Sequence, residues 1–149
     1  MFGIHRNRRT RRPDSLKRRG TAAVETALTL PILIAAVLGI VELGRGIMVS
    51  QILETAARNG ARLAINQGTT NAQVTSNVQT FLQTTANIAP ANVTVAVADN
   101  GNGSASLANA AFGDTISVRV SVPFSAVSWL PPQYLKNVTL SALCVMQHE

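Results

Sequence analysis

Cysteine and histidine are scarce in this chain of 149 residues, which holds one cysteine and two histidines. The single cysteine, Cys144, excludes an intramolecular disulfide and any metal cluster built on cysteine. The histidines, His5 and His148, stand at opposite ends of the sequence without carboxylate or cysteine neighbours at metal-ligand spacing. The sequence therefore predicts no metal and no other cofactor.

Charge is scarce as well, at 13% of the residues, and most of the positive charge lies in one place. Residues 1–20 hold eight lysines and arginines against one acid, a net charge of +7, whereas residues 21–149 have a net charge of −1. A nucleic-acid-binding domain carries positive charge on its folded surface, so nucleic acid is not expected as a partner. The basic segment is short, rich in arginine and interrupted by Pro13, so we expect it to be disordered or handled by other machinery.

Recognisable catalytic motifs are missing too. Serine, histidine and aspartate all occur, but none stands in a nucleophile elbow or beside a phosphate-binding loop. The sequence DNGNGS at 99–104 lacks the alternating acids and distal glutamate of a calcium loop, and it predicts a hairpin turn instead. We therefore expect a structural protein and not an enzyme.

What the sequence does contain is a long apolar run. Residues 21–41 are apolar apart from Glu25 and three threonines, and 26–41 is a stretch of 16 residues without charge. A helix needs about 20 residues to cross the hydrocarbon core of a bilayer, and including residues 21–25 restores that length. The run therefore predicts a single transmembrane helix.

The helical pattern continues beyond residue 42 to about residue 66. Apolar and small side chains recur there every three or four residues, at Val49, Leu53, Ala56, Gly60 and Leu63. This spacing predicts an amphipathic helix, with Glu54 and Arg58 paired on another face. Ala56, Gly60 and Ala61 form a small-residue surface that permits close packing, which we assign to the chain's own sheet in preference to another helix in a filament.

The remainder of the sequence predicts a second helix and a sheet. Residues 71–87 carry a narrow apolar stripe among glutamine, threonine and asparagine, at Val74, Val78, Phe81 and Leu82. The segments 92–99, 114–124 and 137–147 are rich in valine and threonine and alternate between apolar and polar residues, as strands do. The predicted fold class is α+β, with a long N-terminal helix, a second helix and a small antiparallel sheet of three or four strands.

Two aromatic residues, Trp129 and Tyr134, flank the adjacent prolines at 131 and 132. We expect them in the local core or in a rigid loop, with a contact at a filament tip as the alternative.

The junction between the basic segment and the apolar run predicts where the chain is processed. A secretory signal would end in a small-residue cleavage site after the apolar run, but the run continues into GIVELGRG without one. A twin-arginine export signal is a minor alternative, because arginine pairs are inevitable in so basic a segment. A cut before the run fits better, since Gly20 is small enough for a protease to approach the backbone closely.

The stretch RRGTAAVETALTLPILIAAVLGIVELGRGIMVSQILETAARNGARLAI resembles the TadE-like pseudopilins of tight-adherence (Tad or Flp) pilus systems, within the type IV pilin superfamily. The residues that carry the resemblance are Gly20 and Glu25 at the start, Pro31, Glu42 with Gly44, and the block from Ala56 to Arg62. One departure is Thr26, where the family usually has an aromatic residue. Another is Thr21, which would be the new N-terminus.

The resemblance implies cleavage by a prepilin peptidase on the cytoplasmic side, between Gly20 and Thr21. It also implies a bacterial inner-membrane protein that crosses the membrane once, and a minor pilin with a role at pilus initiation or at the tip, and so in adhesion. The implied partners are the peptidase, other pilins and pseudopilins, the inner-membrane assembly platform and membrane lipid. The predicted organisation is a cleaved leader (1–20), a transmembrane and assembly half of the long helix (21–42), and an extracytoplasmic domain (43–149).

Cleavage would give Glu25 a partner, because it creates an α-ammonium group on Thr21. Both charges are costly in an apolar helix bundle, and each neutralises the other. They can pair within one chain as i, i+4 neighbours, or between an incoming subunit and one already assembled.

The alternative is an uncleaved single-pass anchor with a small binding domain, in which Glu25 lies at the membrane surface. In both cases Lys17, Arg18 and Arg19 hold the N-terminus in the cytoplasm and leave the C-terminal domain outside it. A role as the main pilus subunit is a further alternative.

Overall fold

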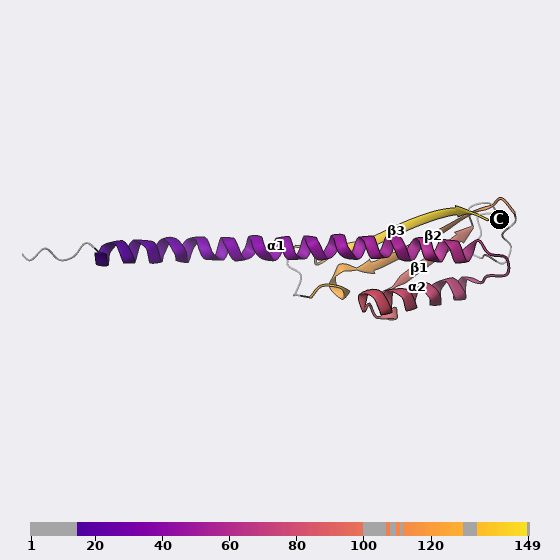
Figure 1. The fold of residues 1–149 in the computed structure, drawn as a ribbon, viewed down its shortest axis with the longest axis horizontal. Coiled ribbons are helices and arrows are strands. Elements are labelled where there is room, and N and C mark those ends of the chain that lie inside the picture. Colours follow the sequence, from indigo (N-terminus) through magenta and orange to yellow (C-terminus); the bar gives the residue numbers. More distant parts are fainter. Residues whose placement is uncertain (1–14, 100–106, 108–109, 111, 130–133, 149) are drawn as a thin grey trace, which may run out of the picture. The chain divides into compact units, whose positions relative to one another are not determined.

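The computed structural model describes residues 15–99, 107, 110, 112–129 and 134–148 (Figure 1). The chain divides into two compact units, residues 1–38 and residues 39–149. The predicted turn at 99–104 lies outside the described residues, apart from Asp99 at its start.

Helix α1 spans Ser15–Ala64 as one continuous element. Its sequence is rich in alanine and leucine, which favour helix, and the helix continues through Pro31, although proline removes one backbone hydrogen bond. The predicted continuity from residue 21 into the amphipathic segment is confirmed. The helix begins at Ser15 and not at Thr21, so the expectation that the whole basic segment lacks structure is wrong for its last residues.

Helix α2 spans Asn71–Ala86 and has well-defined ends. At its start Thr70 and Gln73 form a capping box, in which each side chain accepts a hydrogen bond from the other's backbone amide. At its end Asn87 adopts the left-handed conformation (φ 54°) that closes many helices. The sequence prediction of a second helix over 71–87 is therefore confirmed to within a residue.

Three strands form one antiparallel sheet in the order β1-β2-β3. They span Thr94–Asp99 (β1), Thr115–Pro123 (β2) and Thr139–Gln147 (β3). In the central strand Ile116, Val118, Val120 and Val122 are fully buried, because alternate residues of a strand point to the same face. The α+β class, with its long helix, second helix and small sheet, is confirmed.

The core of the second unit lies between this face of the sheet and the two helices. The later part of α1 contributes Val49 and Leu53, and α2 contributes Val74, Val78 and Leu82, all fully buried. The predicted Glu54–Arg58 pair is present on the exposed side of α1, with 3.1 Å between Oε2 and Nη2.

Small residues of α1 set how closely these layers approach. Ala56 and Ala61 are fully buried in the chain's own core. A Cβ on Gly60 would lie 2.8 Å from Val78 of α2 and 3.3 Å from Val118 of β2. Within this chain the small-residue surface of α1 thus packs against both α2 and the sheet.

Candidate functional site

The first candidate site is the N-terminal part of α1. Gly20, Thr21 and Glu25 all lie on exposed helix surface. Residues four apart share one side of a helix, so the side chains of Thr21 and Glu25 are neighbours along α1. Among the side chains that the structure describes, Glu54 and Arg58 form the one ion pair. Glu25 therefore forms no ion pair with another described side chain.

The hydroxyl groups of two threonines in this segment form hydrogen bonds within the helix. The hydroxyl group of Thr26 donates to the carbonyl oxygen of Ala22 (2.9 Å), and that of Thr29 donates to the carbonyl oxygen of Glu25 (2.9 Å). A hydroxyl satisfied by the preceding turn can face hydrocarbon at a low free-energy cost. The departure from the aromatic residue at Thr26 is thus compatible with membrane insertion.

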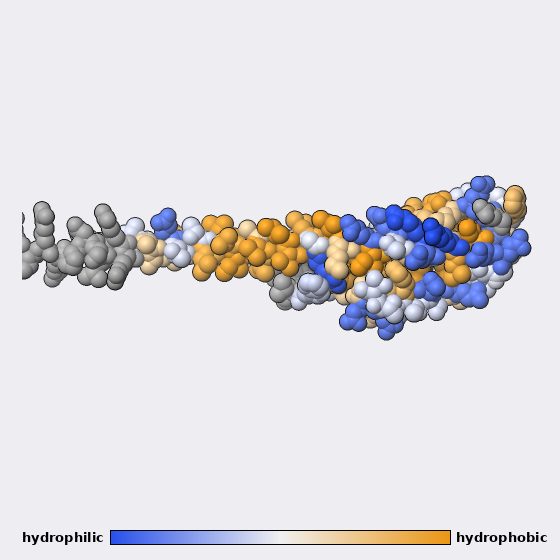
Figure 2. Space-filling model, in the orientation of Figure 1, coloured by the Kyte–Doolittle hydropathy of each residue, from blue (hydrophilic) through white to orange (hydrophobic). Residues whose placement is uncertain are grey.

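Large apolar side chains are exposed along this segment beyond Glu25. Figure 2 shows apolar side chains exposed along the helix, and the large ones include Leu28, Ile32 and Leu33. One segment of α1, within Gly20–Ala64, is long and apolar enough to cross a membrane, and none of its most apolar window is buried within the protein. A single N-terminal apolar helix of this kind fits a single-pass membrane anchor. Lys17, Arg18 and Arg19 belong to the same helix, on its N-terminal side.

A second site lies at the start of the second unit, where α1 meets the segment after β2. Glu42 is buried, at 4% exposure, although it is charged. Its Oε2 atom accepts hydrogen bonds from the backbone amides of Tyr134 (3.0 Å) and Leu135 (3.2 Å). Two amide donors offset the cost of removing a carboxylate from water, and they tie this segment to α1.

Arg45, one turn further along α1, holds the same segment at a second point. Its Nε atom donates to the carbonyl oxygen of Val127 (2.9 Å), and its guanidinium carbon lies 4.7 Å from the centre of the Trp129 ring. Trp129 and Tyr134 are nevertheless 74% and 61% exposed, so the interpretation of these aromatics as local core is wrong.

The sequence did not predict the structural role of Glu42, which was named only as one of the residues that carry the family resemblance. The signal that could have found it is a lone carboxylate between the apolar residues Val41 and Leu43, because such a group needs a specific partner when buried.

Replacing Glu42 with alanine should lower the free energy of unfolding by about 1–3 kcal/mol, because two partly buried amides lose their acceptor. Hydrogen exchange at Tyr134 and Leu135 should become faster. Chemical denaturation and amide exchange of the full chain in detergent measure both effects. Glu54→Ala removes an exposed carboxylate and should change little. Unchanged exchange at both amides in Glu42→Ala would contradict the role of Glu42.

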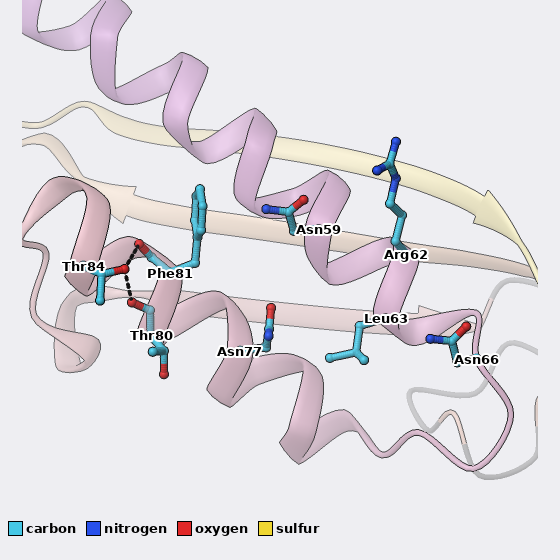
Figure 3. Close-up of a pocket in the computed structure, with 8 residues that line it drawn as sticks. All are labelled: Asn59, Arg62, Leu63, Asn66, Asn77, Thr80, Phe81 and Thr84. Carbon is cyan, nitrogen blue, oxygen red and sulfur yellow. Dashed lines mark hydrogen bonds between the residues drawn. The ribbon is translucent and has the colours of Figure 1, made fainter.

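An open groove between α1 and α2 is another hollow lined by several polar side chains (Figure 3). It is lined by Asn59, Arg62, Leu63, Asn66, Asn77, Thr80, Phe81 and Thr84. Arg62 is the one charged residue among them, and no carboxylate accompanies it. Among the described residues no group of three or more histidine, cysteine, aspartate or glutamate side chains could hold a metal ion.

Comparison with known proteins bears on helix α1, including Asn59 and Arg62 on the α1 side of the groove. The family model described as TadE-like protein matches residues 20–62. Residues 20–62 are thus similar to this family. No curated protein and no solved structure matches the chain.

The TadE-like match confirms the resemblance drawn from the sequence. It begins at Gly20, takes in Glu25 and the apolar run, and continues through Glu42 and Arg45 to Arg62. It thus covers the first site and the α1 side of the second. This TadE-like segment fits a protein associated with a Tad pilus.

Proposed function

We propose that this protein is a minor pseudopilin of a Tad-type pilus, a non-enzymatic subunit that acts at pilus initiation or at the tip and so in adhesion. The observation that carries the proposal is the TadE-like match over residues 20–62, because it begins at the expected cleavage site and includes the whole apolar run. The size of the chain supports a minor role, since the major subunits of such systems are typically much shorter.

The proposed topology follows from charge. Lys17, Arg18 and Arg19 precede the apolar run, and lysine and arginine next to a membrane span favour the cytoplasmic side. The second unit, residues 39–149, would then lie outside the cytoplasm. A prepilin peptidase would cut after Gly20, and other pilins and the inner-membrane assembly platform would receive the product.

The proposed role of Glu25 is to neutralise the α-ammonium group of Thr21 on a neighbouring subunit. Its exposed position on α1 supports this role, because a side chain that is covered within its own chain could not reach a neighbour. A charge that must be matched on assembly also fixes the register of adjacent helices.

One observation favours the alternative of an uncleaved anchor. Because α1 begins at Ser15, the bond between Gly20 and Thr21 lies inside a helix. The first turns must unwind before a protease can grip this bond, whereas an uncleaved anchor requires no such opening.

Replacing Gly20 with leucine separates these two functions. We expect Gly20→Leu to retain the leader and to leave cells without pili, because the larger side chain prevents close approach of the peptidase. The mass of the protein from peptidase-competent cells and the number of pili per cell measure the outcome. Gly44→Leu is the matched control, since a Cβ at Gly44 meets nothing within 4 Å. Normal pilus numbers on Gly20→Leu cells, together with a protein mass that differs from the wild-type mass only by the substitution, would favour the uncleaved anchor.

A further inference from the structure

The segment between β2 and β3 reaches back along α1 as far as the apolar run. A Cβ on Gly39 would lie 3.5 Å from the ring of Tyr134, and Trp129 lies over Arg45. These two positions of α1 are six residues apart, which is about 9 Å along a helix axis. Along the axis of α1, Tyr134 and Trp129 therefore lie on either side of Val41, the last residue of the charge-free run.

The described surface around these aromatics is apolar and exposed. On α1 the neighbouring side chains of Ile40, Leu43 and Ile47 are exposed. A shallow groove beside them is lined mainly by apolar side chains, among which are Leu135 and Val138. Trp129 and Tyr134 add rings that are apolar with one polar atom, the kind of side chain that is enriched at membrane–water interfaces.

The exposed charge around the two aromatics is positive, and Glu54, which also lines the groove, is paired with Arg58. Residues 39–50 and 127–138 contain only three charged residues, which are Glu42, Arg45 and Lys136. Glu42 is buried and bound to two backbone amides, whereas Lys136 is exposed and the guanidinium group of Arg45 faces the ring of Trp129. An anionic headgroup layer complements such a surface.

The length of the apolar run places this surface at a membrane boundary. The charge-free stretch 26–41 has 16 residues, and about 20 are needed to cross the hydrocarbon core. Including residues 21–25 gives a span of residues 21–41, and this span ends between the levels of Tyr134 and Trp129 on α1. Aromatic and basic side chains are the usual anchors at that depth.

We propose that Trp129, Tyr134, Arg45 and Lys136 form a foot that docks the second unit on the anionic headgroup layer of the bilayer that α1 enters. The foot holds the domain at a fixed depth, and it must be released when the protein leaves the membrane. This inference rests on the membrane anchor of the proposed function, but not on processing after Gly20 or on a place in a pilus.

Trp129 is the one tryptophan of the chain, so its fluorescence reports on the foot directly. The full chain is reconstituted into vesicles of phosphatidylethanolamine and phosphatidylglycerol, with quenching lipids labelled at a shallow or a deep position. We expect blue-shifted emission that the shallow label quenches more strongly than the deep label. In vesicles of phosphatidylcholine alone, the quenching should be weaker, because the anionic lipid is absent.

A matched reporter tests whether the whole domain merely adheres to lipid. Phe112 is 86% exposed and lines a pocket together with Ala64, the last residue of α1. Ala64 is about 28 Å along the helix axis from Arg45. The double variant Trp129→Phe with Phe112→Trp should give emission typical of water and no quenching by either label.

Lys136→Gln tests the electrostatic part of the foot, and we expect it to lower the ratio of docked to undocked domains about fivefold in anionic vesicles. Water-like emission from Trp129 in a chain that floats with the vesicles would overturn the foot and leave the anchor intact. Blue-shifted emission without lipid quenching would also overturn it, by showing that another protein copy covers Trp129. A chain that fails to float with vesicles would overturn the anchor, and the foot with it.

Discussion

Replacing Glu25 with alanine should leave the protein in the membrane and abolish its assembly with other pilins. Insertion should be unchanged or improved, because a costly carboxylate leaves the apolar run. Assembly should fail because the α-ammonium group of Thr21 is left unpaired between helices, and breaking such a buried pair costs about 3–5 kcal/mol. The measurements are pilus number per cell and crosslinking to other pilins, at matched expression and processing.

Two further variants sharpen this test. Glu25→Gln keeps the shape and a hydrogen-bond acceptor but loses the charge, so its defect should be milder. Glu54→Ala removes a carboxylate that is already exposed and paired with Arg58, and it should assemble normally. Wild-type piliation with unchanged crosslinks in Glu25→Ala cells would show that Glu25 merely lies at the membrane surface.

The second large effect is expected from removing α1 from the folded domain. A fragment of residues 71–149 should fail to fold cooperatively, whereas a fragment of residues 39–149 should unfold in one transition. The shorter fragment lacks Val49, Leu53 and Ala57, which are fully buried, and a domain of about 80 residues has little core to spare. The longer fragment also keeps Glu42 and its two amide donors.

Circular dichroism during heating measures this difference directly. The fragment 39–149 should show a sigmoidal transition, and the fragment 71–149 a gradual loss of signal without a midpoint. Equal melting temperatures would contradict the packing described here, because α1 would then contribute nothing to the stability of the sheet.

The regular elements could be predicted because each has a strong local signal. The stripe of Val74, Val78 and Leu82 has helical spacing, and the capping pair Thr70 and Gln73 fixes where α2 begins. Segments rich in valine and threonine with a two-residue alternation likewise predicted the strands, most clearly β2, since a strand with one buried face repeats every two residues. These patterns depend only on neighbours along the chain.

The contacts of the segment after β2 could not be predicted in this way. Glu42 and Tyr134 are 92 residues apart in sequence, and the bond joins a side chain to a backbone amide, which carries no sequence signature. The exposure of Trp129 was missed for a related reason, because large aromatic residues are more often buried than exposed in soluble domains. Both features lie where the apolar run ends and the folded domain begins.

The start of α1 was misplaced because arginine was taken as a sign of disorder. Lysine and arginine have good intrinsic helix propensity, so a basic segment that adjoins a strong apolar helix can extend it by a turn or more. The candidate residues Gly20, Thr21 and Glu25, by contrast, could be named from the sequence, because a glycine at a charge junction and a carboxylate in an apolar run are local anomalies.

The most direct test of the account is the intact mass of the wild-type protein extracted from membranes of peptidase-competent cells. The account predicts a chain that begins at Thr21, and a chain that keeps the leader in cells that lack the peptidase. A chain that begins at Met1 in both kinds of cell would contradict it and would leave an uncleaved anchored protein.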